Sequence, residues 1–448
     1  MRVVIHWQDQ KYKLYDQHCP QRHLVTTRID YPQKFEQIVA QTQFDLLPTS
    51  EQAFLKQKAY EFRFTQQELR LLSEMALERA RWKESPLSGE WPVGGLNGDA
   101  VASKKRTFAL LTEKQDFLRY KENDYRHLSL KDKPKTQKPV LKTTVQPHLG
   151  LGRCPVASER TRCCNLMTLD AVEKCGFDCS YCSIQSFYHG NQVEFDSGFA
   201  DKLSKLELDP DKTYHIGTGQ SSDSLMWGNH QGVLEALCDF AERHANVILE
   251  LKTKSRNISW LLKNNVPRNV VCTWSLNPQT IIDYEEHLSA SLAQRLEAAK
   301  ALADKGCVVG FHFHPIIHYS GWETDYQNIC QNIISKFEAN QVALVSMGTL
   351  TFTKSVMKTI RQRELTSKIL QMPMQQSAGK FSYPADIKLE LFKQVYGALS
   401  PWHDKVFFYL CMEPQALWEP VFGFDYTNNE AFEAAMKNAY FAKIHQHI

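Results

Sequence analysis

Short β-branched runs alternate with amphipathic helical stretches between residues 165 and 347, and this alternation narrows the possible folds most. The expected strands are residues 165–169, 213–217, 247–252, 269–274, 307–313 and 342–347, and the helical stretches between them include residues 231–244, 289–305 and 326–339. Such alternation is typical of βαβ units, which build a parallel sheet. Six units in about 190 residues predict an α/β fold, a partial (βα)6 barrel that is open on one side, rather than a closed barrel of eight strands.

The rest of the chain divides into three further segments. Residues 1–130 are expected to form an N-terminal, mainly helical region, with one or two amphipathic helices between residues 50 and 82 and a Gly/Pro-rich loop at 85–98. A basic Pro/Gly linker is expected at 131–153, followed by the barrel at 154–355. Residues 356–448 are expected to form a small C-terminal extension that packs on the barrel, with a helix at 386–398 and a strand at 405–411.

Composition and charge bound the location and the partners. No run approaches the roughly 18 continuous apolar residues of a membrane span, and the N-terminus lacks a signal-peptide pattern, so we expect a cytoplasmic protein with no membrane partner. The net charge is only +3, but residues 103–142 hold twelve Lys or Arg against five Asp or Glu, interleaved with aromatic residues. This segment is compatible with nucleic-acid binding, because basic groups neutralise phosphates and rings stack on bases. A solvated linker is the alternative.

Six of the twelve cysteines fall within residues 154–182, which favours a metal site. Cys175, Cys179 and Cys182 follow a C-x3-C-x2-C spacing. A structural zinc ion or a fully ligated 4Fe-4S cluster takes four protein ligands, so three cysteines would leave one iron open to a substrate or cosubstrate. Three buried or zinc-binding cysteines are the alternative. The remaining three cysteines of this segment are Cys154, Cys163 and Cys164. These three cysteines could bind a second cluster, and the alternative is that they are buried or act as thiols.

Polar residues gather where the expected strands end, the position at which barrels place their chemistry. Residues 217–223 (GTGQSSD) offer glycines for close backbone approach, and hydroxyl and amide groups for hydrogen bonds to a polar ligand. Lys252 and Lys254 share one strand face and could pair with a carboxylate or phosphate, with a solvated strand end as the alternative. His312 and His314 share another face, and we expect hydrogen-bonding roles for them rather than a second metal.

Taken together and in order, these motifs resemble one family. They are residues 174–185 (KCGFDCSYCSIQ), 217–225 (GTGQSSDSL), 250–255 (ELKTKS), 274–278 (WSLNP), 310–315 (GFHFHP), 321–323 (GWE) and 409–413 (YLCME). The chain resembles the radical S-adenosylmethionine (radical SAM) enzymes related to spore photoproduct lyase, from about residue 165 to 423. In that family a 5'-deoxyadenosyl radical, formed by reductive cleavage of S-adenosylmethionine, initiates repair of a thymine dimer in DNA.

The resemblance implies a radical SAM barrel and a set of site residues. The cluster ligands would be Cys175, Cys179 and Cys182, and the cofactor contacts would be Tyr181, Gly217, Gly219, Gln220, Ser222, Lys254 and Ser275. It also implies a 4Fe-4S cluster and S-adenosylmethionine as cofactors. The expected partners are a nucleic acid, DNA rather than RNA, and an external one-electron reductant such as a flavodoxin or ferredoxin.

Two positions depart from the lyase pattern. The cysteine that returns a hydrogen atom in the lyase corresponds to Gln220, whose N–H bond is too strong for that role, and the tyrosine after the third cluster cysteine is Ser183. Gln220 and Cys411 are therefore the candidate catalytic residues, with Cys411 or Cys164 as a replacement thiol donor. Three hypotheses stay open: a radical SAM enzyme acting on nucleic acid, one acting on another substrate, and a nucleic-acid-binding protein with a structural or redox-sensing cluster.

Overall fold

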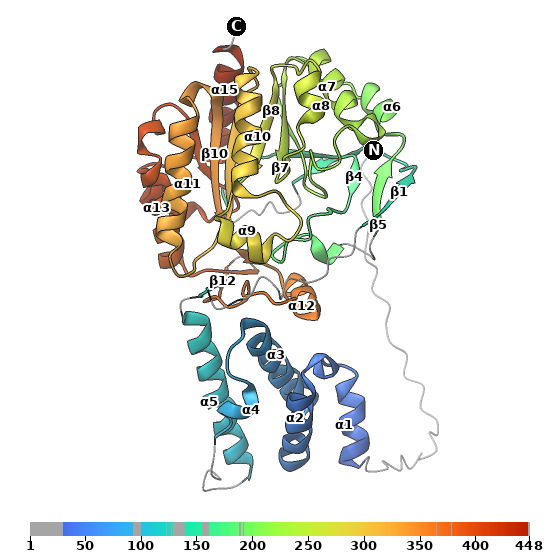
Figure 1. The fold of residues 1–448 in the computed structure, drawn as a ribbon, viewed down its shortest axis with the longest axis vertical. Coiled ribbons are helices and arrows are strands. Elements are labelled where there is room, and N and C mark those ends of the chain that lie inside the picture. The colour runs from blue at the N-terminus through green and yellow to red at the C-terminus, as the bar shows by residue number, and fades with distance from the viewer. Residues whose placement is uncertain are drawn as a thin grey trace, which may run out of the picture.

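The computed structural model describes residues 30–92, 100–121, 123–126, 128, 139–154, 161–187, 190, 192–363, 365–377 and 379–446. Figure 1 shows an α/β lobe above a separate group of helices formed by the first described part of the chain. No helix within these ranges is both long enough and apolar enough to cross a membrane.

An eight-stranded sheet forms the centre of the α/β lobe. Its strands, in spatial order, are β14 (Phe407–Leu410), β10 (Val342–Thr349), β9 (Val309–Ile316), β8 (Val270–Ser275), β7 (Val247–Thr253), β6 (Tyr214–Thr218), β3 (Met167–Asp170) and β2 (Gly150–Arg153). All neighbours pair in parallel except β2 and β3, which are antiparallel. Parallel strands buried on both faces are rich in Val, Ile and Leu, as β7 and β10 are.

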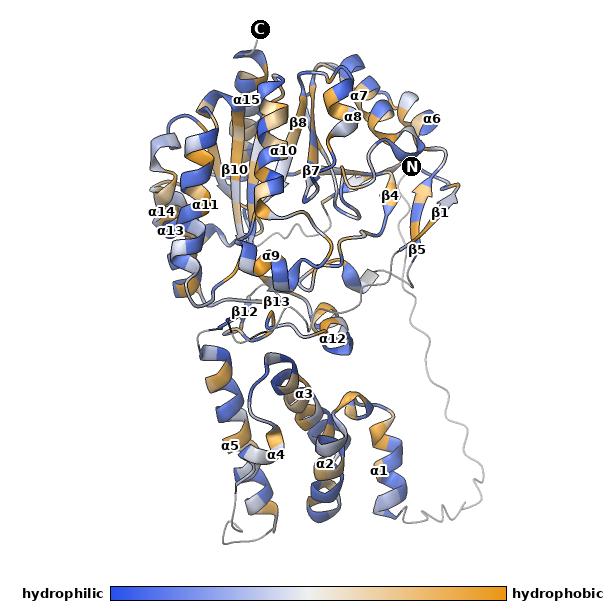
Figure 2. Ribbon diagram, viewed as in Figure 1, coloured by the Kyte–Doolittle hydropathy of each residue, from blue (hydrophilic) through white to orange (hydrophobic). Residues whose placement is uncertain are grey.

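Helices cover the sheet in the manner of repeated βαβ units. They are α6 (Phe199–Ser204), α7 (Val233–Arg243), α8 (Ser259–Lys263), α9 (Gln279–Glu285), α10 (Leu292–Asp304), α11 (Trp322–Lys336), α13 (Ala385–Ala398), α14 (Trp418–Phe422) and α15 (Asn429–Gln446). A capping box fixes the start of α10, where the Ser291 hydroxyl accepts from the Gln294 N–H and the Gln294 side chain accepts from the Ser291 N–H. Figure 2 shows apolar residues concentrated on the strands and mixed faces on these helices.

The predicted parallel strands are confirmed in number and order, and the sheet gains a strand at each edge. β14 continues the parallel series beside β10, although its residues belong to the segment assigned to a C-terminal extension. At the other edge, β2 lies in the segment 131–153 that was predicted to be a linker. That prediction is wrong for the described part of the segment. The exposed edge of β3 offers unpaired backbone groups, and β2 satisfies them.

Two three-stranded sheets flank the barrel. The first contains β1 (Val140–Thr144), β5 (Gln192–Asp196) and β4 (Val172–Glu173), so β1 also falls within the predicted linker. Residues 131–138 of that prediction lie outside the described part of the chain. The second sheet contains β11 (Thr351–Phe352), β13 (Lys380–Ser382) and β12 (Gln375–Ser377). Between β11 and β12 runs α12 (Lys354–Gln362), whose start is capped by the Thr353 hydroxyl.

The N-terminal helices have an apolar core of their own. They are α1 (Tyr31–Val39), α2 (Thr49–Phe62), α3 (Gln66–Trp82), α4 (Leu87–Glu90) and α5 (Ala100–Tyr120). One or two amphipathic helices were predicted between residues 50 and 82, and the structure has two there, α2 and α3. The Gly/Pro-rich loop predicted at 85–98 contains the short α4, and its residues 93–98 lie outside the described ranges. α5 was not predicted, because its alternating basic and aromatic residues lack a clear helical stripe.

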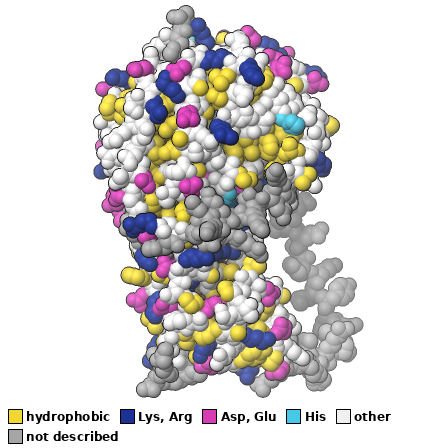
Figure 3. Space-filling view, in the orientation of Figure 1, with side chains coloured by type: hydrophobic (Ala, Val, Ile, Leu, Met, Phe, Trp, Pro, Cys, Tyr) yellow, Lys and Arg dark blue, Asp and Glu magenta, His cyan; other side chains and the backbone are white. Residues whose placement is uncertain are grey.

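One buried carboxylate connects the N-terminal helices to the α/β lobe. Glu78 of α3 accepts hydrogen bonds of 2.8 and 2.7 Å from Arg361 of α12, and a bond of 2.9 Å from Arg119 of α5. Arg81 also donates to the carbonyl of Ile360 at 3.2 Å. In Figure 1, α12 lies between the two groups of elements, and Figure 3 shows Lys and Arg side chains at this waist of the molecule. The two lobes are therefore joined by charged hydrogen bonds.

Candidate active site

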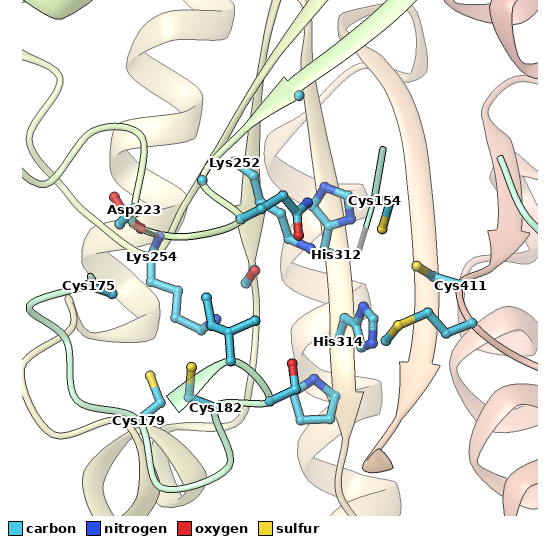
Figure 4. Close-up of a pocket in the computed structure, with 18 of the residues that line it drawn as sticks. Cys154, Cys175, Cys179, Cys182, Asp223, Lys252, Lys254, His312, His314 and Cys411 are labelled. Atoms are coloured by element: carbon cyan, nitrogen blue, oxygen red, sulfur yellow. Dashed lines mark hydrogen bonds between the residues drawn. The ribbon is translucent and has the colours of Figure 1, made fainter. Parts of the chain in front are cut away.

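A cavity opens at the carboxyl ends of the parallel strands, and Figure 4 shows the groups around it. All eleven residues predicted for the site line this one cavity: Cys175, Cys179, Tyr181, Cys182, Gly217, Gly219, Gln220, Ser222, Lys254, Ser275 and Cys411. They come from the loop after β4, from β6 and its following turn, and from β7, β8 and the residue after β14. Sequence positions up to 236 residues apart, from Cys175 to Cys411, thus meet around one space.

The cysteine loop is held in place by the segment that follows α9. The backbone N–H of Ser180 donates to the carbonyl of Glu285 at 2.8 Å, and that of Leu288 donates to the carbonyl of Phe177 at 3.2 Å. Cys179 and Glu286 form an isolated antiparallel bridge between these two hydrogen bonds. The loop is therefore shaped by backbone pairing that does not depend on a ligand.

Burial dominates the chemistry of the three loop thiols. It raises the pKa of Cys175 to about 12, and it raises the pKa values of Cys179 and Cys182, while the positive charge of Lys254 acts in the opposite direction on each. Metal binding replaces the thiol proton, because the thiolate is the ligand. A nearby ammonium group compensates the negative charge of such a site.

The donor set fits an iron–sulfur cluster better than a single ion. Within the described ranges, no three His, Cys, Asp or Glu side chains are gathered closely enough to hold one metal ion. In a 4Fe-4S cluster each cysteine sulfur binds a different iron, so the three sulfurs stay further apart than around a single zinc ion. Figure 4 shows Cys175, Cys179 and Cys182 around one end of the cavity, with Lys254 directed toward them.

Glu286 is the charged centre behind this loop. Its carboxylate accepts hydrogen bonds from Arg295 and Tyr181, and one of 2.8 Å from Asn277. Burial alone would raise the pKa of Glu286, but the charges of Arg295 and Lys254 lower it to about 2. Burial would likewise lower the pKa of Lys254, but Glu286 and the Cys179 thiol raise it. Lys254 is thus a fixed cation beside the cysteines.

A tight turn after β6 forms the adjoining wall. Gly219 adopts a φ of +86°, and a Cβ there would lie 2.6 Å from the carbonyl oxygen of Lys252, so only glycine fits. Asp223 closes the turn by accepting hydrogen bonds from the Thr253 hydroxyl at 2.7 Å and the Lys254 N–H at 2.6 Å. This arrangement ties the turn to β7 and leaves Gln220 on the cavity wall.

Two of the predicted cofactor contacts already have protein partners. The Ser222 hydroxyl donates to the carbonyl of Lys174 at 3.0 Å and accepts from Trp227 at 3.2 Å, which links the turn to the start of the cysteine loop. The Tyr181 hydroxyl donates to Glu286. These two residues shape the cavity wall in the observed state, and their contact with a bound cofactor stays a prediction.

A buried network of hydrogen bonds centred on Glu250 forms the floor of the cavity. Glu250 accepts hydrogen bonds from His312 at 2.7 Å, from Thr273 at 2.9 Å and from His215 at 2.8 Å. The other ring nitrogen of His312 pairs with Ser346. The predicted hydrogen-bonding role is therefore confirmed for His312. His314 forms no hydrogen bond with the described part of the chain.

Three further thiols line the opposite end of the cavity, and Cys163 is adjacent to one of them, Cys164. Cys154, Cys164 and Cys411 line it, and Figure 4 shows Cys154 and Cys411 facing the same space. The hydrogen bond from Cys164 lowers the pKa of Cys163 to about 6, and burial raises the pKa of Cys411 to about 12. No three of these cysteines meet at single-ion distances within the described ranges. A second cluster at Cys154, Cys163 and Cys164 stays untested.

The basic segment 103–142 is partly neutralised within the protein. Lys104, Lys114, Arg119 and Lys121 form ion pairs with Glu68, Glu90, Glu78 and Glu84. These contacts join α5 to the other N-terminal helices. Tyr125 is buried and donates to Glu285 at 2.8 Å, so it cannot stack on a base. The solvated-linker alternative is wrong for α5, and the nucleic-acid alternative loses these four cations.

Two residues that shape the site had no sequence signal. Glu286 lies outside every motif, and only its burial beside Arg295 reveals its role. Arg363 follows α12 and donates to Oδ1 of Asp178 at 2.7 Å and to the carbonyl of Cys179 at 3.3 Å. A lone arginine some 180 positions from the cysteines gives no pattern that sequence analysis could recognise.

Comparison with known proteins shows which proteins this chain resembles. Residues 171–391 match the family model described as spore photoproduct lyase. The chain is 24% identical over 223 residues to a spore photoproduct lyase of Clostridium acetobutylicum, covering 48% of this chain and 64% of that protein. It is 23% identical over 202 residues to one from a Geobacillus species, covering 44% and 59%. The match thus spans less than two thirds of either relative.

Solved structures agree on the fold. A spore photoproduct lyase complexed with dinucleoside spore photoproduct superposes with a TM-score of 0.52 at 17% identity, covering 64% of this chain and 89% of the other. A variant with bound AdoMet and dinucleoside spore photoproduct gives 0.51 at 18% identity with the same coverage. The fold is a partial α/β barrel like that of these solved spore photoproduct lyases. The chain is thus similar to spore photoproduct lyases over about half of its length.

Proposed function

We propose that this protein is a radical SAM enzyme that acts on nucleic acid, in the manner of the lyase that repairs a DNA lesion. The observation that carries the proposal is the single cavity shared by three loop cysteines, Lys254 and the glycine turn. A catalytic cluster leaves one iron without a protein ligand, and three cysteines satisfy that condition. A purely structural site would need neither the open position nor the cavity around it.

Cys175, Cys179 and Cys182 would hold the 4Fe-4S cluster. When bound, the cluster supplies an electron that cleaves S-adenosylmethionine into methionine and a 5'-deoxyadenosyl radical. Lys254 is placed to pair with the carboxylate of the cofactor, because it is a charged ammonium at the cysteine end of the cavity. The absence of side chains at Gly217 and Gly219 permits close approach of a ligand, and Gln220 and Ser275 offer hydrogen-bonding groups on the same wall.

The substrate assignment rests on the relatives. Spore photoproduct lyases have been solved with dinucleoside spore photoproduct, a product of two linked nucleosides. The present chain differs from the lyase pattern at Gln220, which cannot return a hydrogen atom to a substrate radical. We assign the role of hydrogen-atom donor to the Cys411 thiol instead. Cys411 follows β14 and lines the same cavity, and its thiol is protonated at neutral pH. A protonated thiol can donate a hydrogen atom, whereas a thiolate cannot.

The first experiment tests cofactor chemistry. Protein purified without oxygen should hold about one 4Fe-4S cluster per chain, and with dithionite it should convert S-adenosylmethionine to 5'-deoxyadenosine, measured by mass spectrometry. Cys179→Ala should abolish both. Cys238→Ala is the matched control, because Cys238 is buried in α7 outside the cavity. A cluster-loaded protein that leaves S-adenosylmethionine intact would refute the enzyme proposal.

The second experiment tests the substrate. Oligonucleotides deuterated at thymine, irradiated and unirradiated, are incubated with the reduced enzyme, and deuterium is sought in 5'-deoxyadenosine. Transfer from irradiated DNA supports lesion repair. Cleavage of S-adenosylmethionine without any transfer from nucleic acid points to a different substrate. Cys411→Ala should retain deuterium transfer while losing formation of the repaired thymines, with Cys330→Ala as a buried control outside the cavity.

A further inference from the structure

Lys252 occupies an inward-facing layer of the barrel between the cysteine loop and the thiols at the opposite end. Alternation along β7 directs Glu250, Lys252 and Lys254 to the same side of the sheet, and all three line the cavity. Figure 4 shows Lys252 directed toward the space between the glycine turn and His312. Lys252 therefore brings a full positive charge to the middle of the cavity.

No carboxylate in the described ranges neutralises this charge. The nearest acidic residue along the strand, Glu250, has both oxygens engaged: Oε1 accepts from His312 and Thr273, and Oε2 accepts from His215. The Lys252 side chain forms no hydrogen bond or ion pair with described residues, whereas its backbone carbonyl accepts from the Ser224 N–H at 3.2 Å. Lys254 differs, because Glu286 balances it. Lys252 is partly buried and lines the cavity without an ion-pair partner among the described residues, so its ammonium group is available to an anionic ligand.

The side chains that face Lys252 are neutral. Burial lowers the pKa of His312 to about 4 and holds the pKa of His314 well below its usual value, and the charge of Lys252 contributes to both shifts. Across the space, the Cys411 thiol stays protonated because burial raises its pKa. A neutral His314 has one ring N–H to donate, and this ring has no hydrogen-bond partner among the described residues.

The ring of His314 packs closely against Gly348 of β10. Gly348 of β10 lies against the ring, so that a Cβ at Gly348 would come within 2.8 Å of Cδ2 and Nε2 of His314. The glycine lets the imidazole lie flat against β10, on the wall that also carries Cys411. Lys252 and His314 thus present one ammonium and one imidazole to the same space, from two strands of the sheet.

We propose that Lys252 and His314 form an anion subsite that binds the phosphodiester linking two nucleosides of the substrate. This inference rests on the proposed action on nucleic acid and adds the group by which that substrate is held. A lysine ammonium is a compact charge suited to phosphate, and an imidazole N–H adds a directional hydrogen bond. The subsite lies between the cofactor wall and Cys411, so a bound phosphodiester places its flanking bases between the radical source and the thiol.

The cofactor's carboxylate is the competing anion. Lys254 is better placed for it, because Lys254 lies over the Tyr181 ring at 5.8 Å and responds to the Cys179 thiol, next to the cluster end. Lys252 lowers the pKa values of His312 and His314 more than Lys254 does, and it also lowers the pKa of Cys411. The two lysines therefore serve different parts of the cavity, and the experiment separates them.

The test compares two ligands that differ only in the phosphate. Binding of dinucleoside spore photoproduct, which lacks a linking phosphate, is measured against the phosphodiester-linked dinucleotide by calorimetry, with the cluster-loaded protein. The native protein should bind the dinucleotide about tenfold more tightly, as expected for one charged hydrogen-bonded contact. Lys252→Met should bind the two ligands equally, and Lys252→Arg should restore part of the preference. Lys263→Met, at an exposed lysine of α8, is the matched control.

The outcomes distinguish this inference from the function on which it rests. A Lys252→Met protein that loads its cluster, binds S-adenosylmethionine normally and loses the phosphate preference supports the subsite. Retention of the preference in that variant overturns it. Weaker S-adenosylmethionine binding with an unchanged phosphate preference also overturns it and assigns Lys252 to the cofactor. If the native protein binds neither ligand while cleaving S-adenosylmethionine, the nucleic-acid substrate itself is wrong.

Discussion

Arg363 donates a hydrogen bond from Nη2 to Oδ1 of Asp178 at 2.7 Å, which fastens the end of α12 to the cysteine loop. Its other terminal nitrogen donates to the Cys179 carbonyl at 3.3 Å and to the Gln185 side chain at 3.1 Å. One side chain thus holds three points of the loop that would carry the cluster.

We expect Arg363→Ala to loosen this loop and weaken cluster retention. Loss of a charged hydrogen bond costs about 1.5 to 3 kcal/mol, and partial exposure of Arg363 places the effect at the lower end, so iron should pass to a chelator about tenfold faster. The measurement is the rate of bleaching of the cluster absorbance. Arg363→Lys should recover part of the retention, and Arg268→Ala, at an exposed arginine, should change nothing. Equal rates for Arg363→Ala and native protein would contradict the role of this contact.

The ion pair between Glu286 and Arg295 predicts an acid-dependent stability. The folded pKa of Glu286 is about 2, below its ordinary value of 4.5, so the unfolded state binds more protons between these values. The stabilisation is fully present above about pH 5 and is lost as the pH falls toward 2. Glu286→Gln should therefore lower the free energy of unfolding by about 3 kcal/mol at pH 7, because it leaves Arg295 buried without an opposite charge.

Urea unfolding of Glu286→Gln and native protein at pH 7 and pH 3.5 measures this effect. The difference between the two proteins should shrink at the lower pH, where Glu286 begins to lose its charge advantage. Glu297→Gln, on the exposed face of the same helix as Arg295, should show no such difference. A difference that is the same at both pH values would mean that the carboxylate charge is not what stabilises the loop.

The adjacent thiols Cys163 and Cys164 predict selective alkylation. A pKa of about 6 makes Cys163 mostly thiolate at pH 7, and the thiolate is the reactive form. Iodoacetamide should therefore modify Cys163 before the cavity thiols Cys164 and Cys411, with a midpoint below the pKa of an ordinary thiol, as followed by peptide mass spectrometry. Cys164→Ala removes the hydrogen bond that lowers this pKa and should shift the midpoint upward by one unit or more. An unchanged midpoint in that variant would assign the low pKa to another cause.

The ion pairs of Glu78 predict that the position of α12 in the α/β lobe depends on the N-terminal helices. Glu78→Gln leaves Arg361 and Arg119 near an uncharged group at a position that is 2% exposed, and about 2 kcal/mol of stability should be lost. Backbone amides of α12 should then exchange with solvent faster, as measured by hydrogen–deuterium exchange. Glu113→Gln, at an exposed position of α5, serves as the control. Unchanged exchange in α12 would show that the N-terminal helices contribute little to its position.

The barrel could be predicted because each strand carries its own signal. β-branched runs of five to eight residues specify β6 to β10 locally, and parallel neighbours follow from the helices between them. β2 could not be predicted in this way. Its sequence, Gly-Leu-Gly-Arg, has low strand propensity, and it becomes a strand only because the edge of β3 supplies hydrogen-bonding partners.

The candidate site divides along the same line. The cysteine spacing and residues 217–223 can be recognised in the sequence, because each motif combines several residue types within a few positions. Glu286 and Arg363 act through burial and long-range contact, which a single residue type does not encode. For the basic segment, the sequence suggested free charges that the structure shows to be paired. Lys104 and Lys121 form ion pairs with Glu68 and Glu84, which are distant in the sequence.

The contacts of α12 bear on where this chain can be divided. Arg361 of α12 pairs with Glu78 of the N-terminal helices. Arg363, two residues later, pairs with Asp178 of the cysteine loop. A barrel produced without its N-terminal helices would keep the contact of Arg363 with Asp178, but it would expose Arg361 without its counter-ions Glu74 and Glu78. The α/β lobe therefore depends on the N-terminal helices for the charge balance of α12, and shortened versions should be made by cutting elsewhere than between α5 and β1.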